Sequence, residues 1–254
     1  MSNISHEVGA TIKNLSVTGV TVGIPSATDV FLHLKESGLT IAGDHVNGWL
    51  NEGTSGGTLT PLSGRTSPHT GTGLNGYDTV LMSYDAGDGG LAVTLSSGIV
   101  VPYTLMFLAK YAVPASGKLA LPFRLTAGTN FSAQYAWMVM SWNTGANCWR
   151  YLSHTTIYDL LTAGAARYYG NPTGDWSIYS LTVGADGVVA VQNQGEALLS
   201  ASSVYTSTFR SFELGNSVSR HVADFAEVLG WRKILSADEL AMAVRYLNMK
   251  YGLI

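Results

Sequence analysis

The chain has 254 residues, a net charge of −3 and 12% charged residues, about half the share found in a typical soluble domain. Hydrophobic residues make up 46%, which excludes a disordered chain, and no block of Lys or Arg points to nucleic acid or an anionic membrane surface. The single cysteine, Cys148, excludes a disulfide within the chain. Low charge with 29 glycines favours short strands joined by tight turns, and the length fits one large all-β domain.

Residues 1–28 differ from the rest of the chain. Small and β-branched residues alternate weakly there, and Pro25 ends the run. The pattern predicts either a first strand or, as we favour, an N-terminal arm that attaches to a partner. The N-terminus has neither the basic nor the apolar segment of a signal peptide, so we expect a complete chain, without a leader, made in the cytoplasm.

Residues 29–254 carry the β signal. Residues 51–76 are rich in Gly, Ser, Thr and Pro, and we expect a long loop there. Trp176–Val183 and Val188–Gln192 predict a hairpin around an Asp-Gly turn. Runs of β-branched and aromatic residues predict further strands near 30–34, 46–50, 78–84, 91–95, 99–110, 119–126, 134–142, 149–152, 209–214 and 223–231.

One helix is predicted at the C-terminal end. Ser236 and Glu239 have the spacing of a capping box, and Gly252 is a suitable C-cap. Apolar residues recur at helical spacing from Leu240 to Tyr251. We expect this helix to pack on the sheets as a terminal clasp.

Three stretches resemble one family. Residues 38–51 resemble its first motif, in which one strand turns into a Trp-containing strand before a Gly-rich loop. Residues 74–88 resemble its second motif, an Asn-Gly turn, a strand and an Asp-rich turn. Residues 224–253 are similar to the closing strand and helix, and they are the most specific of the three. The family is the concanavalin A-like, or laminin-G-like, jelly roll. The resemblance implies that residues 29–254 form an all-β sandwich of two antiparallel sheets with one C-terminal α-helix.

Domains of this family often bind carbohydrate and are frequent in bacterial surface proteins and bacteriophage virions. The resemblance therefore implies a structural protein of a phage virion, a tail fibre, spike or head decoration, whose lectin-like face binds host surface glycans. We expect attachment to other virion proteins through residues 1–28 and a homo-oligomer, by analogy a trimer. We expect no enzymatic activity, no cofactor, no nucleic acid partner and no membrane insertion.

The acidic residues give little sign of glycan hydrolysis. Retaining hydrolysis needs two carboxyl groups about 5–5.5 Å apart, and the spacings typical of jelly-roll glucanases are absent. Asp224 and Glu227 lie three apart on a predicted strand, so we expect them on opposite faces. Asp85 and Asp88 are expected to form a turn, and they are at most a weak Ca²⁺ candidate because Ca²⁺ takes about six to eight oxygen ligands.

Two motif matches and the histidines are interpreted as non-catalytic. Residues 53–57 fit G-x-S-x-G and residues 71–76 fit G-x-G-x-x-G, but neither stretch precedes a predicted helix, as a nucleophile elbow or dinucleotide site requires. No two of the six histidines have the helical spacing of a zinc site, so no metal site is predicted from them. Cys148 is interpreted as buried packing.

Aromatic residues between 142 and 176 are the best functional lead. Sugar rings stack on aromatic rings, and amide or carboxylate groups bind the hydroxyls. The same rings could instead fill the core, which we favour for Trp142 and Trp176, and Trp49 is also expected in the core. The candidate carbohydrate-binding residues are Asn147, Trp149, Tyr151, Tyr168, Tyr169, Asn171 and Asp175.

Two alternatives remain open at this point. A purely structural shell or decoration protein would place Trp149, Tyr168 and Tyr169 in the core or at a subunit interface. A glycan-degrading enzyme would need two carboxylates converging in a concave groove.

Overall fold

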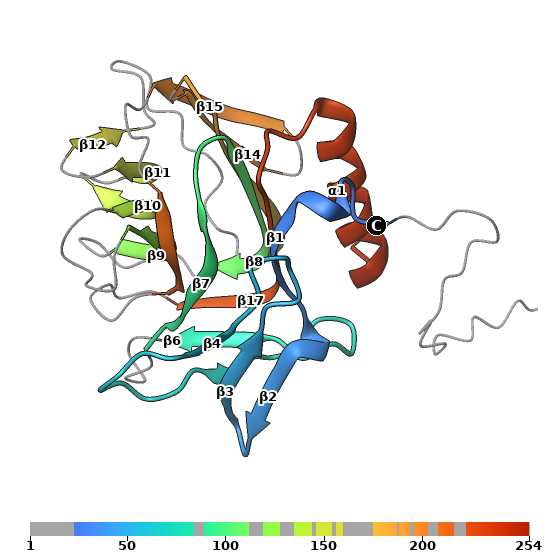
Figure 1. Ribbon diagram of the computed structural model, residues 1–254. Coiled ribbons are helices and arrows are strands. Elements are labelled where there is room, and N and C mark those ends of the chain that lie inside the picture. Colours follow the sequence, from blue (N-terminus) through green and yellow to red (C-terminus); the bar gives the residue numbers. More distant parts are fainter. Residues whose placement is uncertain are drawn as a thin grey trace, which may run out of the picture.

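A computed structural model describes residues 23–83, 89–111, 119–127, 135–143, 146–153, 156–159, 175–186, 188–193, 196–202, 208–215 and 222–253. Within them the chain is mostly antiparallel β-sheet, curled on itself and followed by one C-terminal helix (Figure 1). Residues 1–22 of the predicted arm lie outside the described residues, so the boundary at residue 28 stays a prediction.

Hydrogen bonds join the strands into two sets linked by one strand. The helix-side set contains β1 (Val30–Leu34), β2 (Leu39–Ala42), β3 (His45–Leu50), β5 (His69–Thr70), β6 (Val80–Ser83), β8 (Tyr103–Tyr111), β13 (Trp176–Val183), β14 (Val188–Asn193), β15 (Glu196–Ser202) and β17 (Val222–Trp231). The opposite set contains β7 (Leu91–Ile99), β9 (Leu119–Thr126), β10 (Tyr135–Asn143), β11 (Ala146–Ser153), β12 (Thr156–Asp159) and β16 (Phe209–Leu214). The linking strand, β4 (Thr58–Pro61), pairs with β3 and with β7, so the pairing is continuous from one set to the other.

The main core joins the two sets. Phe107 on β8 contacts Phe123 on β9, with ring centroids 5.6 Å apart, and Phe123 stacks on Phe212 of β16 at 6.2 Å. Tyr103 and Phe209 make a second such contact at 6.5 Å. These five side chains are fully or almost fully buried, so aromatic packing is a large part of what holds the sets together.

A second apolar cluster lies on the other side of the helix-side set, under α1 (Ala237–Tyr251). The helix is at the right of Figure 1 and strands β9 to β12 are at the left, with β8 and β17 between them. Leu240 and Leu247 of the helix share this cluster with Met106 and Leu108 of β8. Strand β8 is therefore buried on both faces, which explains the apolar run at its centre, residues 105–109.

The helix confirms its prediction in detail. The Ser236 hydroxyl accepts a hydrogen bond from the backbone N–H of Glu239, and the Glu239 carboxylate accepts one from the backbone N–H of Ser236. Gly252 ends the helix in the left-handed conformation, with φ of 61°. Trp49 is completely buried, as expected, and its indole N–H donates to the carbonyl of Lys35.

The loop predicted over residues 51–76 is wrong in part, because it contains β4 and β5. Strands β12 and β15 were also not anticipated. β4, β5 and β12 have two to four residues each, too few for a pattern to stand out from the surrounding polar sequence. The predicted hairpin at 176–192 is confirmed by antiparallel pairing of β13 with β14.

A β-bulge in β17 corrects the expectation for the two acidic residues of that strand. Phe225 pairs with Ala109 and Glu227 pairs with Leu108, so Ala226 is an extra residue. Phe225 belongs to the main core, whereas Ala226 lies in the cluster under the helix and Glu227 bonds to helix side chains. Asp224, one residue before Phe225, therefore shares the helix-side face with Glu227 instead of facing the opposite way.

Candidate functional site

The predicted carbohydrate-binding residues fall only in part within the described structure. Tyr168, Tyr169 and Asn171 lie outside the described residues, as do Asp85 and Asp88 of the weak Ca²⁺ candidate. Asp175 is described and exposed immediately before β13. The described residues therefore contain four of the seven candidates, namely Asn147, Trp149, Tyr151 and Asp175.

Asn147, Trp149 and Tyr151 occupy alternate positions of β11, and only their backbone is described. Tyr151 pairs with Met138 of β10, and Met138 pairs with Phe123 of β9. Positions in line across neighbouring strands lie on the same face of a sheet, and Phe123 lies in the main core. This register gives weight to the packing interpretation of the three positions, which remains open beside the glycan interpretation.

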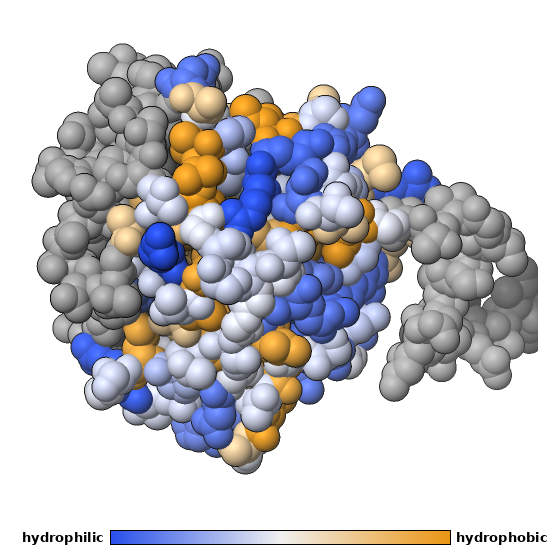
Figure 2. Space-filling view, in the orientation of Figure 1, coloured by the Kyte–Doolittle hydropathy of each residue, from blue (hydrophilic) through white to orange (hydrophobic). Residues whose placement is uncertain are grey.

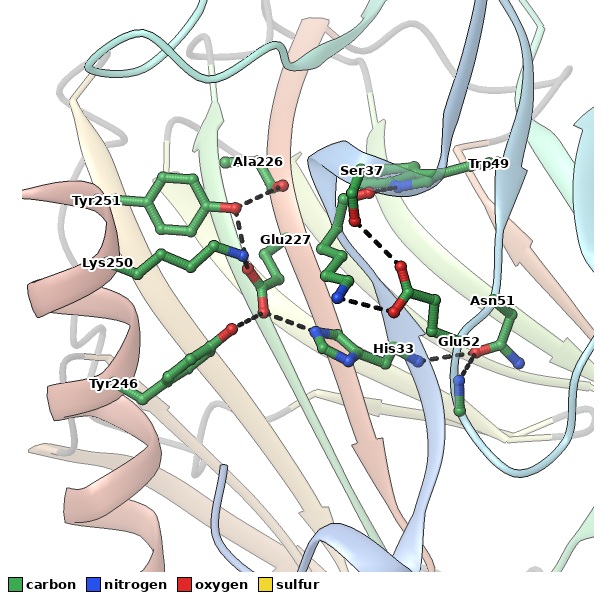
Figure 3. Close-up of polar contacts among 12 residues, drawn as sticks. His33, Ser37, Trp49, Asn51, Glu52, Ala226, Glu227, Tyr246, Lys250 and Tyr251 are labelled. Carbon is green, nitrogen blue, oxygen red and sulfur yellow. Dashed lines mark hydrogen bonds and ion pairs between the residues drawn. The ribbon is translucent and has the colours of Figure 1, made fainter. Parts of the chain in front are cut away.

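The most developed polar site among the described residues surrounds Glu227, beneath the helix (Figure 3). Its Oε1 accepts hydrogen bonds from His33 Nε2 at 3.0 Å and from the Tyr246 hydroxyl at 3.1 Å. Its Oε2 accepts from the Tyr251 hydroxyl at 2.9 Å and from Lys250 Nζ. The donors come from β1 and α1, so one carboxylate on β17 ties both elements to the sheet.

The environment of Glu227 keeps this carboxyl ionised. Burial by itself raises the pKa of Glu227, but the hydrogen bond from His33 and the charge of Lys250 outweigh it, so the pKa lies below its ordinary value. Burial, followed by the charge of Glu227, raises the pKa of Tyr246 and Tyr251, so both phenols stay protonated and donate. The site is therefore a satisfied buried anion.

A second polar layer lies beside this site, around the segment that follows β3. Lys35 forms an ion pair of 2.7 Å with Glu52, and Ser37 donates to the same carboxylate at 3.1 Å. The side chain of Asn51 accepts from the backbone of His33 and Gly53 (Figure 3). These bonds fix the loop that follows β3 against β1.

The chemistry of the Glu227 site favours a structural role. A general acid of a glycosidase needs access to its substrate and a raised pKa. Glu227 has an exposed fraction of 0% and a lowered pKa, and both of its oxygens are engaged. A carboxylate in this state can hold the helix on the sheet but has no free position for a substrate.

Two other buried carboxylates have raised pKa values. Burial raises the pKa of Asp224 more than its polar contacts with Thr79 and Thr72 lower it, and its Oδ1 makes no hydrogen bond. Arg124 on β9 donates a hydrogen bond of 3.0 Å from its Nε to Glu213 on the neighbouring strand β16. Burial nevertheless raises the pKa of Glu213 more than Arg124 lowers it. These two groups lie in different strand sets and form no catalytic pair among the described residues.

Both motif matches have structural explanations. The stretch 53–57 joins β3 to β4, and a Cβ at Gly53 would lie 2.5 Å from the backbone of Phe31. The stretch 71–76 joins β5 to β6, and a Cβ at Gly71 would lie 2.1 Å from Asp224 Oδ1. Neither stretch opens a helix, as the sequence indicated, and close packing explains the glycine at 53 and at 71.

A polar cluster that sequence reasoning missed lies at the β2–β3 turn. Asp44, His45 and His69 each place a ligand-type atom within 4.8 Å of the others, and these residue types bind metal ions. Their spacing along the chain is not a helical one. They come together through the pairing of His45 on β3 with His69 on β5, and β5 lies inside the predicted loop, so no local pattern pointed to it.

The described surface shows no single apolar face in the view of Figure 2, where apolar residues form small groups among polar ones. Ile41 of β2 and Leu50 of β3 are among the exposed large apolar side chains. Among the described residues, no helix combines the length and apolar character needed to cross a membrane.

Comparison with known proteins finds similarity in structure alone. No protein-family model matches the chain, and no curated protein matches its sequence. The binding domain of Paraclostridial Mosquitocidal Protein 1 matches with a TM-score of 0.57 and 13% identity, covering 87% of this chain and 53% of that one. The binding domain of botulinum neurotoxin serotype D matches with a TM-score of 0.54 and 14% identity, covering 86% and 51%.

The serotype D ligand-binding domain in complex with N-acetylneuraminic acid is also similar, with a TM-score of 0.52, 13% identity and coverage of 86% and 51%. The chain thus spans about half the length of the solved structures that it matches. At this identity the likeness establishes a shared β-rich fold.

Proposed function

We propose that this chain is a glycan-binding module without enzymatic activity. The observation that carries the proposal is its shared fold with toxin binding domains, one of them solved in complex with N-acetylneuraminic acid. The fold is matched over most of this chain. The described acidic residues add support against catalysis, because Glu227 is fully engaged and Asp224 and Glu213 are buried.

The finer parts of the proposal concern the architecture and the setting. We infer that the helix-side set and the opposite set are the two sheets of a concanavalin A-like jelly roll, since the main core joins them. The setting is a phage virion, where residues 1–28 attach a homo-oligomer to other virion proteins. The support for the setting is the family resemblance in residues 38–51, 74–88 and 224–253.

A purely structural role is the second candidate, and the register of β11 favours it. Tyr151 is in line with the core position Phe123 through Met138, and Trp149 is two residues before Tyr151 on the same strand, so both could serve packing alone. Binding would then have to use other residues or be absent.

The test is a glycan-binding assay on the purified chain, with sialylated oligosaccharides and their desialylated counterparts as the first probes. We compare Tyr168→Ala and Trp149→Ala with Asp186→Ala, an exposed position in the turn between β13 and β14. Selective binding that is lost in Tyr168→Ala, with unchanged thermal unfolding, supports the glycan site. Unfolding of Trp149→Ala assigns that residue to packing.

Absence of binding by a folded chain to a broad glycan array would overturn the glycan proposal and favour the structural candidate. Release of a shortened glycan during the assay would instead show an enzyme. For the setting, light scattering of the full chain and of a variant lacking residues 1–28 tests oligomerisation and the arm. A monomeric full chain contradicts the proposed homo-oligomer.

A further inference from the structure

We propose that Asp44, His45 and His69 bind a Zn²⁺ ion at the β2–β3 turn. The three residues offer two imidazoles and one carboxylate, and one ligand atom from each lies within 4.8 Å of the others. Imidazole and carboxylate are established zinc ligands, and open zinc sites commonly use three protein ligands plus water. This inference is independent of the glycan-binding proposal.

The backbone holds the three residues in a fixed frame. His45 of β3 and His69 of β5 are direct partners across an antiparallel pair. The N–H of Val46 donates to the carbonyl of Pro68 at 2.7 Å, and the N–H of Thr70 donates to the carbonyl of Asp44 at 2.8 Å. A metal ion would therefore bind to side chains whose backbone positions are already set by the sheet, which lowers the entropy lost on binding.

The imidazole of His45 is oriented with Nε2 toward the cluster. Its Nδ1 lies 3.0 Å from the carbonyl oxygen of Ser67, which can only accept a hydrogen bond. In the neutral ring Nδ1 therefore carries the proton, and Nε2 keeps a lone pair for a metal. A backbone carbonyl on the other ring nitrogen is the usual partner of a metal-bound histidine.

The separation of the first two ligand atoms suits a tetrahedral ion. Nε2 of His45 lies 3.4 Å from Oδ1 of Asp44. Two ligands placed about 2.0–2.1 Å from a tetrahedral Zn²⁺ are about 3.3–3.4 Å apart. The ring centroids of His69 and His45 lie 4.3 Å apart and the ligand atom of His69 lies within 4.8 Å of the other two, so the side chain of His69 must rotate closer to become the third ligand.

Exposure leaves room for a fourth ligand from solvent. The Asp44 side chain is 75% exposed and that of His45 is 34% exposed, so the cluster faces water. Nitrogen ligands select zinc over Ca²⁺, which takes oxygen ligands. A bound ion would tie the β2–β3 turn to the two-residue strand β5.

Isothermal titration of the chelator-treated full chain with Zn²⁺ alone tests the site. We expect one ion per chain, and an affinity at least ~100-fold weaker in His45→Ala and in His69→Ala, because loss of even an outer partner costs about 10–100-fold. His6→Ala is the matched control, a histidine far from these residues in sequence, and it should bind as the parent chain does. Thermal unfolding without metal should be similar in all four proteins, which separates ligand loss from misfolding.

Two further readouts decide the outcome. Added Zn²⁺ should raise the melting temperature of the parent and of His6→Ala but not of the two site variants. Co²⁺ in place of Zn²⁺ should give the intense visible absorption of a four-coordinate site. No saturable binding by the folded parent, or equal binding by His45→Ala and His69→Ala, overturns the proposal.

Discussion

Two buried carboxylates on the same face of β17, only three residues apart, have opposite environments. Glu227 meets four side-chain donors and its pKa is lowered. Asp224 is also buried, yet its Oδ1 makes no hydrogen bond and its pKa is raised by burial. Burial raises the pKa of both acids, so burial alone does not explain the difference between them. The hydrogen bonds and the positive charge that neighbouring elements bring to Glu227 do.

The largest expected loss of stability comes from removing Glu227, whose two carboxylate oxygens both accept hydrogen bonds. Glu227→Ala should lower the free energy of unfolding by about 3–5 kcal/mol, because it breaks a buried ion pair and leaves several donors without an acceptor. Urea denaturation measures the loss. Glu52→Ala removes a half-exposed partner of Lys35 and should cost no more than about 1 kcal/mol. Equal losses in the two variants would show that the donors of Glu227 find water instead.

A smaller effect is expected from crowding Asp224, whose Oδ2 accepts hydrogen bonds from Thr72 but whose Oδ1 has none. Gly71→Ala places a Cβ 2.1 Å from Asp224 Oδ1 and 2.2 Å from Thr79 Oγ1, so the loop must shift. We expect a loss of about 1–3 kcal/mol, as for other overpacked sites, from the same denaturation experiment. Gly23→Ala is the control, since a Cβ there meets nothing within 4 Å. An unchanged stability for Gly71→Ala would mean that Asp224 has room to move.

The smallest effect is a change in pH dependence. The raised pKa of Asp224 means that, as pH rises above its ordinary value of 3.8, the folded chain keeps a proton that the unfolded chain has released. Stability from this group is therefore present at low pH and is lost as pH rises toward the folded-state pKa. Asp224→Asn should remove that loss. The free energy of unfolding of this variant, relative to that of the parent chain, should therefore increase as pH rises from 3.8 toward the folded-state pKa of Asp224.

Glu227 should behave in the opposite sense. Its lowered pKa gives stability that is present above its ordinary value of 4.5 and is lost as pH falls through the lower folded-state pKa. Denaturation curves of the parent and Asp224→Asn over a pH series separate the two groups. A difference between these proteins that does not vary with pH would contradict the assigned shift of Asp224.

Much of the fold could be predicted from local sequence. The helix could be predicted because the signals at its two ends are local. Ser236 and Glu239 form the capping box at its start, and Gly252 directly follows its last residue. Strand β8 could be predicted because its apolar run exceeds what a loop would contain, and β13 because an Asp-Gly turn follows it. The bulge at Ala226 was missed, since only the pairing with β8 shows the extra residue.

Sites that depend on remote pairing could not be predicted in this way. His45 and His69 meet through a two-residue strand inside a Gly- and Pro-rich stretch. The donors of Glu227 likewise come from β1 and from α1. The aromatic residues proposed for glycan binding are predictions from composition, and binding experiments are their direct test.

The closure of β1 against β17 has a consequence for how the chain is made. The indole N–H of Trp231 donates to the carbonyl of Pro25 at 2.8 Å, between residues 206 positions apart. A ribosome must therefore add most of the chain before β1 meets its partner strand. Until then an apolar strand edge stays open to other chains. Contacts between such remote residues also slow folding, so we expect a slow folder that gains from chaperones during synthesis.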